Sequence, residues 1–291
     1  MSSSLLIIGA GYIGKHLASL ASNAEYGLVP HTVNRQASDE TDSNTSPQNH
    51  HVADVSSLNS LLNLKQRLGS APDTIVHCAS SGRGGGIEAY QKVYLEGIKN
   101  LVSAFPTSHL IYTSSTSVYG QIHGELVTET SSASPTKDTG KVLRQAEDTC
   151  LQVKGTVLRL AGIYGPQRSM ILKNFQLGKA NLEEDGSRYI NQIHQHDAAT
   201  AILHAVQHPE LFRGEIFNVT DSSPITQLEC YEYLSQALNA PMPTPVPKKL
   251  NSKRGWTHKQ VSNAKLLQSG WEPKYTNFFQ AVESVLPTIE L

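Results

Sequence analysis

The sequence predicts an α/β fold with a doubly wound parallel sheet. As far as Gly165, apolar runs that are typical of buried parallel strands alternate with segments of helical periodicity. The first of these runs, Leu5–Ile8, leads directly into the glycine pattern G-x-G-x-x-G. The alternation ends after Gly165-Pro166. We therefore expect a sheet domain followed by a smaller C-terminal lobe.

Strands and helices are expected in a regular order in the first part of the chain. The expected strands are Leu5–Gly9, Leu28–Asn34, His50–Ala53, Thr74–Ala79, His109–Ser114 and Thr156–Leu160. The expected helices are Tyr12–Ser22, Ser57–Leu64, Ile87–Ala104 and Lys137–Val153. Strands that alternate with helices in this way favour βαβ units in one parallel sheet.

Three glycines follow the first strand and predict a dinucleotide site in a Rossmann-like fold. Gly9, Gly11 and Gly14 allow a tight turn, close approach of the backbone to a pyrophosphate, and close packing of helix on strand. The helix that begins at Tyr12 directs its N–H groups and its dipole toward the phosphates. Tyr12 and Ile13 are therefore candidate cofactor contacts with the three glycines. The alternative is a tight glycine turn without a ligand.

Three other segments have simple patterns. Gln36–Asn49 is nearly all polar and predicts a surface loop. Thr226 and Glu229 form the capping-box pattern before an apolar-periodic helix that ends near Leu238. A proline-rich connection, Pro241–Pro247, follows.

Composition limits the classes of protein that fit. The chain has 291 residues and a formal net charge of -1, which gives no electrostatic reason to expect nucleic acid or an anionic membrane as a partner. No apolar run approaches the length of a membrane span, and Leu5–Ile8 is too short for a signal peptide. Three widely spaced cysteines favour reduced core thiols over disulfides. We expect a soluble, cytoplasmic enzyme with a small-molecule substrate.

Four further motifs give a specific resemblance. Ile75–Ala79 and Tyr112–Gly120 resemble the fourth-strand and fifth-strand signatures of the extended short-chain dehydrogenases/reductases, which include nucleotide-sugar epimerases and dehydratases. Leu158–Pro166 resembles the R-x-x-x-x-Y-G-P bend by which this family leaves the cofactor domain. Arg188–Asp197 resembles the segment that returns to it.

The resemblance implies domain boundaries, a substrate class and an assembly. It implies an NAD(P)-binding domain of residues 1–165, with 193–220 returning to it, and a substrate lobe of residues 166–192 and 221–291. The implied substrate is a sugar or nucleotide sugar that reacts at a hydroxyl or carbonyl group. The helices corresponding to 87–104 and 137–153 commonly pair in family dimers, so we also expect a homodimer.

The family's catalytic Y-x-x-x-K pattern is incomplete in this sequence. Lys141 takes the place of the lysine, but Lys137 stands where the tyrosine is expected. The lysine of that pattern lowers the pKa of the phenol. The chain resembles an atypical subgroup that lacks this tyrosine. Lys137 is either a solvated residue at the helix start or, as one of a like-charged pair with Lys141, a neutral amine that acts as acid or base.

Other hydroxyl groups are candidates for the chemistry. Ser115 matches the family serine that hydrogen-bonds the substrate oxygen. Tyr119, and after it Tyr94, are candidates for proton transfer. For both tyrosines the alternative is a packing role. Ser115, Tyr119 and Lys141 are the candidate catalytic residues.

The second strand favours NADP, with NAD as the alternative. An acidic residue at its end accepts the ribose 2′-OH of NAD, whereas an arginine suits the 2′-phosphate of NADP. Here the strand ends in Asn34-Arg35, with no acidic residue before Asp39. The alternative is that Arg35 is a solvated loop cation.

The remaining cofactor contacts follow from the resemblance. It places Asp54 and Val55 beside the adenine and Ala79 and Ser80 along the pyrophosphate and ribose, while Lys141 reaches the nicotinamide ribose.

Two further groups of residues complete the expectations. The glycine-rich loop Ser80–Gly86 has the backbone freedom to contact substrate or nicotinamide, and its Arg83 is either an anion contact or a solvated cation. The histidines lack the spacing of a metal motif, so we expect no metal. His194 and Asp197 are expected to form helix-start and interdomain hydrogen bonds. A non-catalytic NADP(H)-binding sensor or interaction protein is the alternative to an enzyme.

Overall fold

The computed structural model describes residues 3–36, 49–82, 85–247 and 256–291, which form two compact units. Unit 1 contains residues 1–118, 138–159 and 199–217, and unit 2 contains residues 119–137, 160–198 and 218–291. Much of the loop expected at Gln36–Asn49, and Arg83 with it, lies outside the described residues.

A seven-stranded sheet has the strand order β12-β7-β5-β4-β1-β2-β3. The strands are β1 (Ser3–Ile8), β2 (Leu28–Asn34), β3 (His50–Val52), β4 (Thr74–His77), β5 (His109–Ser115), β7 (Thr156–Leu160) and β12 (Ile216–Val219). All pairs from β3 to β5 are parallel, and Ile8 of β1 lies opposite both Val33 and His77. The order reverses between β1 and β4, which is the point where such sheets bind ligands.

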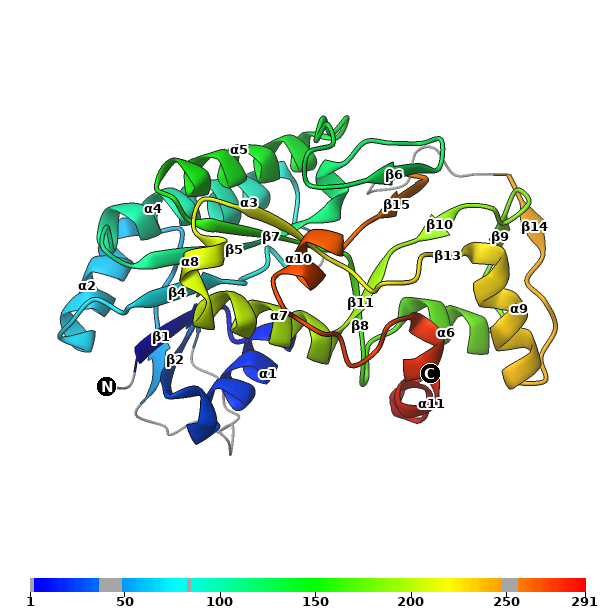
Figure 1. Ribbon diagram of the computed structural model, residues 1–291, viewed down its shortest axis with the longest axis horizontal. Coiled ribbons are helices and arrows are strands. Elements are labelled where there is room, and N and C mark those ends of the chain that lie inside the picture. The colour runs from blue at the N-terminus through cyan, green and yellow to red at the C-terminus, as the bar shows by residue number, and fades with distance from the viewer. Residues whose placement is uncertain (1–2, 37–48, 83–84, 248–255) are drawn as a thin grey trace. The chain divides into compact units, whose positions relative to one another are not determined.

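Helices cover both faces of this sheet. They are α1 (Tyr12–Ala21), α2 (Leu58–Leu68), α3 (Ile87–Tyr90), α4 (Gly97–Ala104), α5 (Asp138–Gln152) and α8 (Pro209–Phe212), with α7 (Gln195–Gln207) running from unit 2 into unit 1. Helices α4 and α5 lie together on one face, and α1 lies on the other (Figure 1). Because each helix buries an apolar stripe against the sheet, the alternation seen in the sequence gives this layered arrangement.

The expected helix over 87–104 is interrupted by a π-helical segment, Gln91–Glu96. This wider turn carries Tyr94, whose hydroxyl oxygen accepts a hydrogen bond from the backbone N–H of Ser81 at 3.3 Å. The apolar periodicity of the sequence does not reveal such a turn, because π-helical segments depend on local contacts rather than on the 3.6-residue repeat.

Unit 2 is built from short strand pairs and helices. The pairs are β6 (Glu125–Val127) with β15 (Lys259–Val261), β8 (Gly162–Tyr164) with β11 (Gln192–His194), β9 (Leu182–Glu183) with β14 (Pro245–Val246), and β10 (Tyr189–Ile190) with β13 (Ile225–Thr226). The helices are α6 (Met170–Gln176), α9 (Gln227–Ala237), α10 (Ala264–Gln268) and α11 (Phe278–Val285). The connection expected at Pro241–Pro247 therefore contains a strand, because its end pairs with β9.

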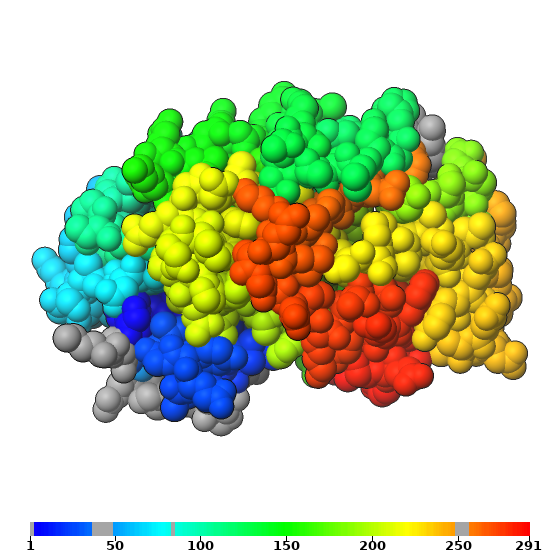
Figure 2. Space-filling model, viewed as in Figure 1, coloured from blue at the N-terminus to red at the C-terminus, as the bar shows by residue number. Residues whose placement is uncertain are grey.

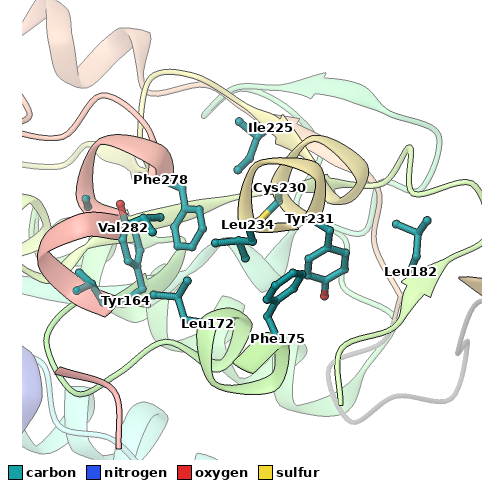
Figure 3. Packing of buried hydrophobic residues seen from close by; sticks show 12 residues of the cluster. Tyr164, Leu172, Phe175, Leu182, Ile225, Cys230, Tyr231, Leu234, Phe278 and Val282 are labelled. Atoms are coloured by element: carbon teal, nitrogen blue, oxygen red, sulfur yellow. The ribbon is translucent and has the colours of Figure 1, made fainter. Parts of the chain in front are cut away.

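The core of unit 2 lies between α6, α9 and α11. Phe175 and Tyr231 stack with ring centroids 5.8 Å apart, and Tyr164 meets Phe278 edge to face at 5.1 Å (Figure 3). The predicted capping box at Thr226 and Glu229 is present and fixes the start of α9. The C-terminal part of the chain, including α10 and α11, forms a broad surface of this unit (orange to red in Figure 2).

The two units divide the chain differently from the boundaries expected from sequence. Residues 119–137 belong to unit 2, because β6 pairs with β15 there. Residues 160–165 and 193–198 belong to it as well, because β8 pairs with β11. No helix among the described residues is long and apolar enough to cross a membrane. The three cysteines are free, and two of them, Cys150 and Cys230, are buried.

Candidate functional site

The glycine turn after β1 combines two tightly packed positions with an open one. Gly9 has a φ of +99°, and a Cβ there would lie 2.4 Å from the Cα of Ala79. A Cβ at Gly14 would lie 2.1 Å from the carbonyl oxygen of Gly9. At Gly11, by contrast, a Cβ would meet no atom of the described residues within 4 Å. Gly9 and Gly14 are therefore needed for packing, whereas Gly11 leaves space beside the backbone.

Helix α1 begins directly after this space. Its N-cap is Gly11, no side chain caps it, and its first turn contains no acidic residue. Since the N-terminus of a helix carries partial positive charge, this turn favours a negatively charged group. Tyr12 and Ile13 are the first two residues of the helix, and Ile13 is buried. The residues present therefore fit the pyrophosphate of a dinucleotide.

The end of β2 supplies one contact that the sequence analysis missed. The Oδ1 atom of Asn34 accepts a hydrogen bond from the backbone N–H of Ala10 at 2.9 Å, so Asn34 fixes the glycine turn. The position of Asn34 at the end of the strand, next to Arg35, is the feature of the sequence that could have indicated this contact. Arg35 is exposed and forms no hydrogen bond or ion pair with the residues described here.

The residues expected around the adenosine and pyrophosphate follow β3 and β4. Asp54 accepts hydrogen bonds from the N–H and the hydroxyl of Ser56 at 2.9 and 2.8 Å, so its carboxylate stabilises the turn after β3. Val55 is buried, Ala79 packs on Gly9, and Ser80 is exposed. Unit 1 thus brings all these strand ends to the same edge of one sheet.

Ser115 and Lys141 lie in unit 1 as well. Ser115 is the last residue of β5, is half-buried, and accepts a hydrogen bond from the N–H of Ser117 at 3.2 Å. The ammonium of Lys141 on α5 forms an ion pair with Asp138 at 2.9 Å, and 58% of the Lys141 side chain is exposed. Lys137 is exposed. That exposure favours the solvated alternative for Lys137.

A buried ionic cluster includes Ser114, the residue before Ser115. Glu147 of α5 is fully buried and accepts a hydrogen bond from Ser114 at 2.5 Å and one from Arg159 of β7 at 2.7 Å. Arg144 donates to the same carboxylate. In the sequence, the only sign of this cluster is that Glu147, a charged residue, lies on the apolar stripe of helix α5. The cluster fixes α5 against β5 and β7.

Tyr119 has the contacts of a packing residue. Its side chain is completely buried, and its hydroxyl lies 2.9 Å from the Oδ1 atom of Asn218 and 3.1 Å from the carbonyl oxygen of Thr128. All three residues belong to unit 2. These contacts of the hydroxyl favour the packing alternative for Tyr119, and its role in proton transfer stays a prediction.

Tyr94 remains available by geometry. Its hydroxyl oxygen accepts from Ser81, so the hydroxyl proton is not used in that bond. Its ring lies 5.0 Å from that of Tyr90 and 6.5 Å from that of His77, measured between centroids. Burial lowers the pKa of His77 to about 4, so this imidazole is neutral.

Asp197 and His194 stabilise unit 2 internally. The carboxylate of Asp197 accepts the N–H groups of Lys274 and Tyr275 at 2.7 and 3.0 Å. The ring of His194 lies between Tyr164 and Tyr275, with centroids 5.3 and 4.4 Å away. By the boundaries expected from sequence, residues 193–220 belong to the cofactor domain and residues 221–291 to the lobe, so the two bonds of Asp197 are the expected interdomain ones. In the structure both partners belong to unit 2.

Comparison with known proteins agrees with this geometry. Residues 5–220 match the profile of the NAD dependent epimerase/dehydratase family. Protein YeeZ of Escherichia coli (strain K12) is 37% identical over 132 residues, which is 43% of this chain and 46% of that protein. The chain spans about half the length of the curated relatives it matches.

Solved structures extend the similarity over nearly the whole chain. A Methylobacillus flagellatus protein assigned to the NAD-dependent epimerases/dehydratases is 25% identical, with a TM-score of 0.79 and coverage of 99% of this chain and 98% of that one. The dTDP-glucose 4,6-dehydratase of Bacillus anthracis, solved with NAD, is 21% identical, with a TM-score of 0.79 and coverage of 98% and 96%. At that identity the likeness shows the fold. By its family match and its fold, the chain belongs to the NAD-dependent epimerase/dehydratase family.

Proposed function

We propose that this chain is an NAD(P)-dependent oxidoreductase or epimerase/dehydratase that acts on a hydroxyl or carbonyl group of a sugar or nucleotide-sugar-like substrate. The observation that carries the proposal is the open position at Gly11 in front of an uncapped helix, between two glycines that packing requires. The family match and the NAD complex of the dTDP-glucose dehydratase support the same cofactor class.

In the proposed mechanism the cofactor and the residues of the chain have separate roles. The nicotinamide supplies hydride transfer when it is bound. The glycine turn and the N-terminus of α1 would hold the pyrophosphate, and Asn34 keeps that turn in place. We assign the substrate oxygen to the hydroxyl of Ser115. Lys141 would leave Asp138 to contact the nicotinamide ribose, a move that costs little because the pair is exposed.

Proton transfer is assigned to Tyr94. Of the two tyrosines considered, it is the one whose hydroxyl proton is not committed to an internal acceptor. Positioned proton transfer contributes typically about 10²–10⁴-fold to a rate. Tyr94→Phe should therefore lower turnover by at least about ten-fold and leave cofactor affinity unchanged.

The preferred cofactor is NADP(H), because Arg35 is exposed, has no partner among the described residues, and carries the charge that suits the 2′-phosphate. A charge-assisted hydrogen bond of this kind is worth about 1.5–3 kcal/mol, or roughly ten- to a hundred-fold in affinity. Calorimetric titration of NADPH and NADH should show that preference in the wild type and lose it in Arg35→Asp. Equal affinities of the wild type for both cofactors would contradict the proposed preference for NADP(H).

The experiment for the activity itself is a screen for hydride transfer. Wild-type protein with NADP⁺ or NAD⁺ is incubated with a panel of sugars and nucleotide sugars, and the absorbance of the reduced cofactor is followed. An epimerase returns the hydride, so product analysis by NMR accompanies the absorbance. The proposal is supported if the wild type turns over a substrate and Ser115→Ala does so more slowly. Tight cofactor binding without any turnover would favour the sensor class.

The assembly that we propose is a cytoplasmic homodimer, for which the free cysteines and the near-neutral charge are the supporting observations on location. Pairing through residues 87–104 and 137–153 would give a particle of about twice the 31.7 kDa chain in light scattering. The single-chain mass at micromolar concentration would contradict it.

A further inference from the structure

Unit 2 contains a buried lysine that the proposed mechanism does not use. Lys259, the first residue of β15, is only 3% exposed. Its Nζ atom donates one hydrogen bond, to the carbonyl oxygen of Tyr119 at 2.8 Å. It forms no ion pair with any carboxylate of the residues that the structure describes. An ammonium has three N–H donors, so two of them are unassigned.

The carboxylate opposite Lys259 in the strand pair does not neutralise its ammonium. Glu125 lies opposite Lys259 in the β6–β15 pair, where the two strands run side by side (Figure 1). The Glu125 carboxylate is exposed and accepts the backbone N–H of His123 at 2.8 Å instead. Burial lowers the pKa of Lys259 to about 8, with Glu125 opposing this only in part. At neutral pH the buried amine is therefore still mostly charged.

The backbone around Lys259 is held rigidly. The side-chain amide of Asn191 donates to the carbonyl oxygen of Lys259 at 3.0 Å and accepts the N–H of Val261 at 2.8 Å. On the same segment, the carbonyl oxygen of Ser262 accepts from Asn218 at 3.1 Å. A side chain on so firmly positioned a strand is preorganised, which is what a binding residue requires.

The charge of Lys259 lacks an anionic partner among the described residues. A buried cation with no anionic partner is costly, and an apolar residue of similar size would usually be more stable there. Such a residue is expected where a ligand supplies the missing negative charge.

We infer that Lys259 binds an oxyanion, a phosphoryl or carboxylate oxygen, through the two N–H donors that its bond to Tyr119 leaves free. This inference does not rest on the proposed function, because the oxyanion site lies in unit 2 and involves none of the cofactor residues.

The test measures the titration of the Lys259 side chain itself and does not require catalytic turnover. Protein labelled with ¹³C at the lysine side chains is titrated with base, and the signal that disappears in Lys259→Met is assigned to this residue. The titration is repeated with inorganic phosphate and, separately, with acetate, both in the presence of saturating NADP⁺ so that phosphate does not occupy the cofactor site. An oxyanion at Lys259 raises the midpoint of its titration, because the charged form gains a partner.

Two variants make the binding measurement specific. Lys259→Met should weaken phosphate binding roughly ten- to a hundred-fold, and Lys259→Arg should retain part of it because the charge remains. Lys173→Met is the matched control, because Lys173 also donates from Nζ to a backbone carbonyl in unit 2, that of Glu290 at 2.8 Å, but its side chain is only half-buried and this hydrogen bond is exposed. That control should bind as the wild type does.

The outcomes separate this inference from the proposed function. A midpoint shift with phosphate alone, or with acetate alone, supports the inference and tells which oxyanion fits. No shift with either ion, together with wild-type phosphate affinity in Lys259→Met, would overturn it. A clear shift in protein that catalyses no hydride transfer would leave the oxyanion site standing while the proposed reaction fails.

Discussion

Glu147 in unit 1 and Lys259 in unit 2 are both ionisable and both buried, but their surroundings are opposite. The carboxylate of Glu147 contacts Arg159, Arg144 and the hydroxyl of Ser114. The amine of Lys259 contacts one backbone carbonyl. A fully partnered charge holds α5 against the sheet, so Glu147 has a structural reason to be there. The difference teaches that the partners of a buried charge, rather than its burial, distinguish a structural group from a candidate binding group.

The largest expected effect comes from removing the charge of Glu147. Glu147→Gln leaves Arg159 buried at 1% exposure without its counter-ion, and breaking a buried pair in this way costs about 3–5 kcal/mol. Urea unfolding measures the loss. Asp148→Asn is the control, since Asp148 pairs with the same Arg144 but is 56% exposed, and it should cost less than about 1 kcal/mol. Equal losses in the two variants would contradict the structural role of the cluster.

The second effect is the part of the pH dependence of stability that Lys259 contributes. Its pKa falls from 10.5 in the unfolded chain to about 8 in the fold. Between these values the unfolded chain binds more protons, so the stability of the wild type should rise with pH relative to Lys259→Met. The full gain is on the order of 3 kcal/mol. Urea unfolding at pH 7, 8, 9 and 10 gives the difference, and a constant difference would show that Lys259 is not desolvated.

The third effect compares the two tyrosines. Tyr119→Phe leaves the buried amide oxygen of Asn218 without the hydroxyl, which should cost about 1–2 kcal/mol of stability and leave turnover of the folded enzyme within about two-fold. Tyr94→Phe should show the reverse pattern, with lower turnover at little cost in stability. Loss of turnover in Tyr119→Phe at unchanged stability would return the catalytic role to Tyr119.

The parts of the fold that depend on local patterns were predictable from sequence. The strands Leu28–Asn34 and Thr156–Leu160, the capping box at Thr226 and the glycine turn were found because periodicity and turn chemistry are local. The packing of Tyr119 was not, because Asn218 lies 99 residues away in the chain. Lys259 gave no signal for the same reason, since its contact with Tyr119 spans 140 residues. Long-range polar contacts have no period in the sequence.

The central claim is that the glycine turn binds a dinucleotide, and one titration tests it most directly. A side chain at Gly11 would clash with no described atom and its φ of -90° suits any residue, so Gly11→Val should fold as the wild type does. The same side chain would occupy the space for the pyrophosphate. Calorimetric titration of NADPH and NADH should show binding to the wild type and at least about ten-fold weaker binding to Gly11→Val. Equal affinity of the two proteins, or no binding of either cofactor to the wild type, would contradict the account.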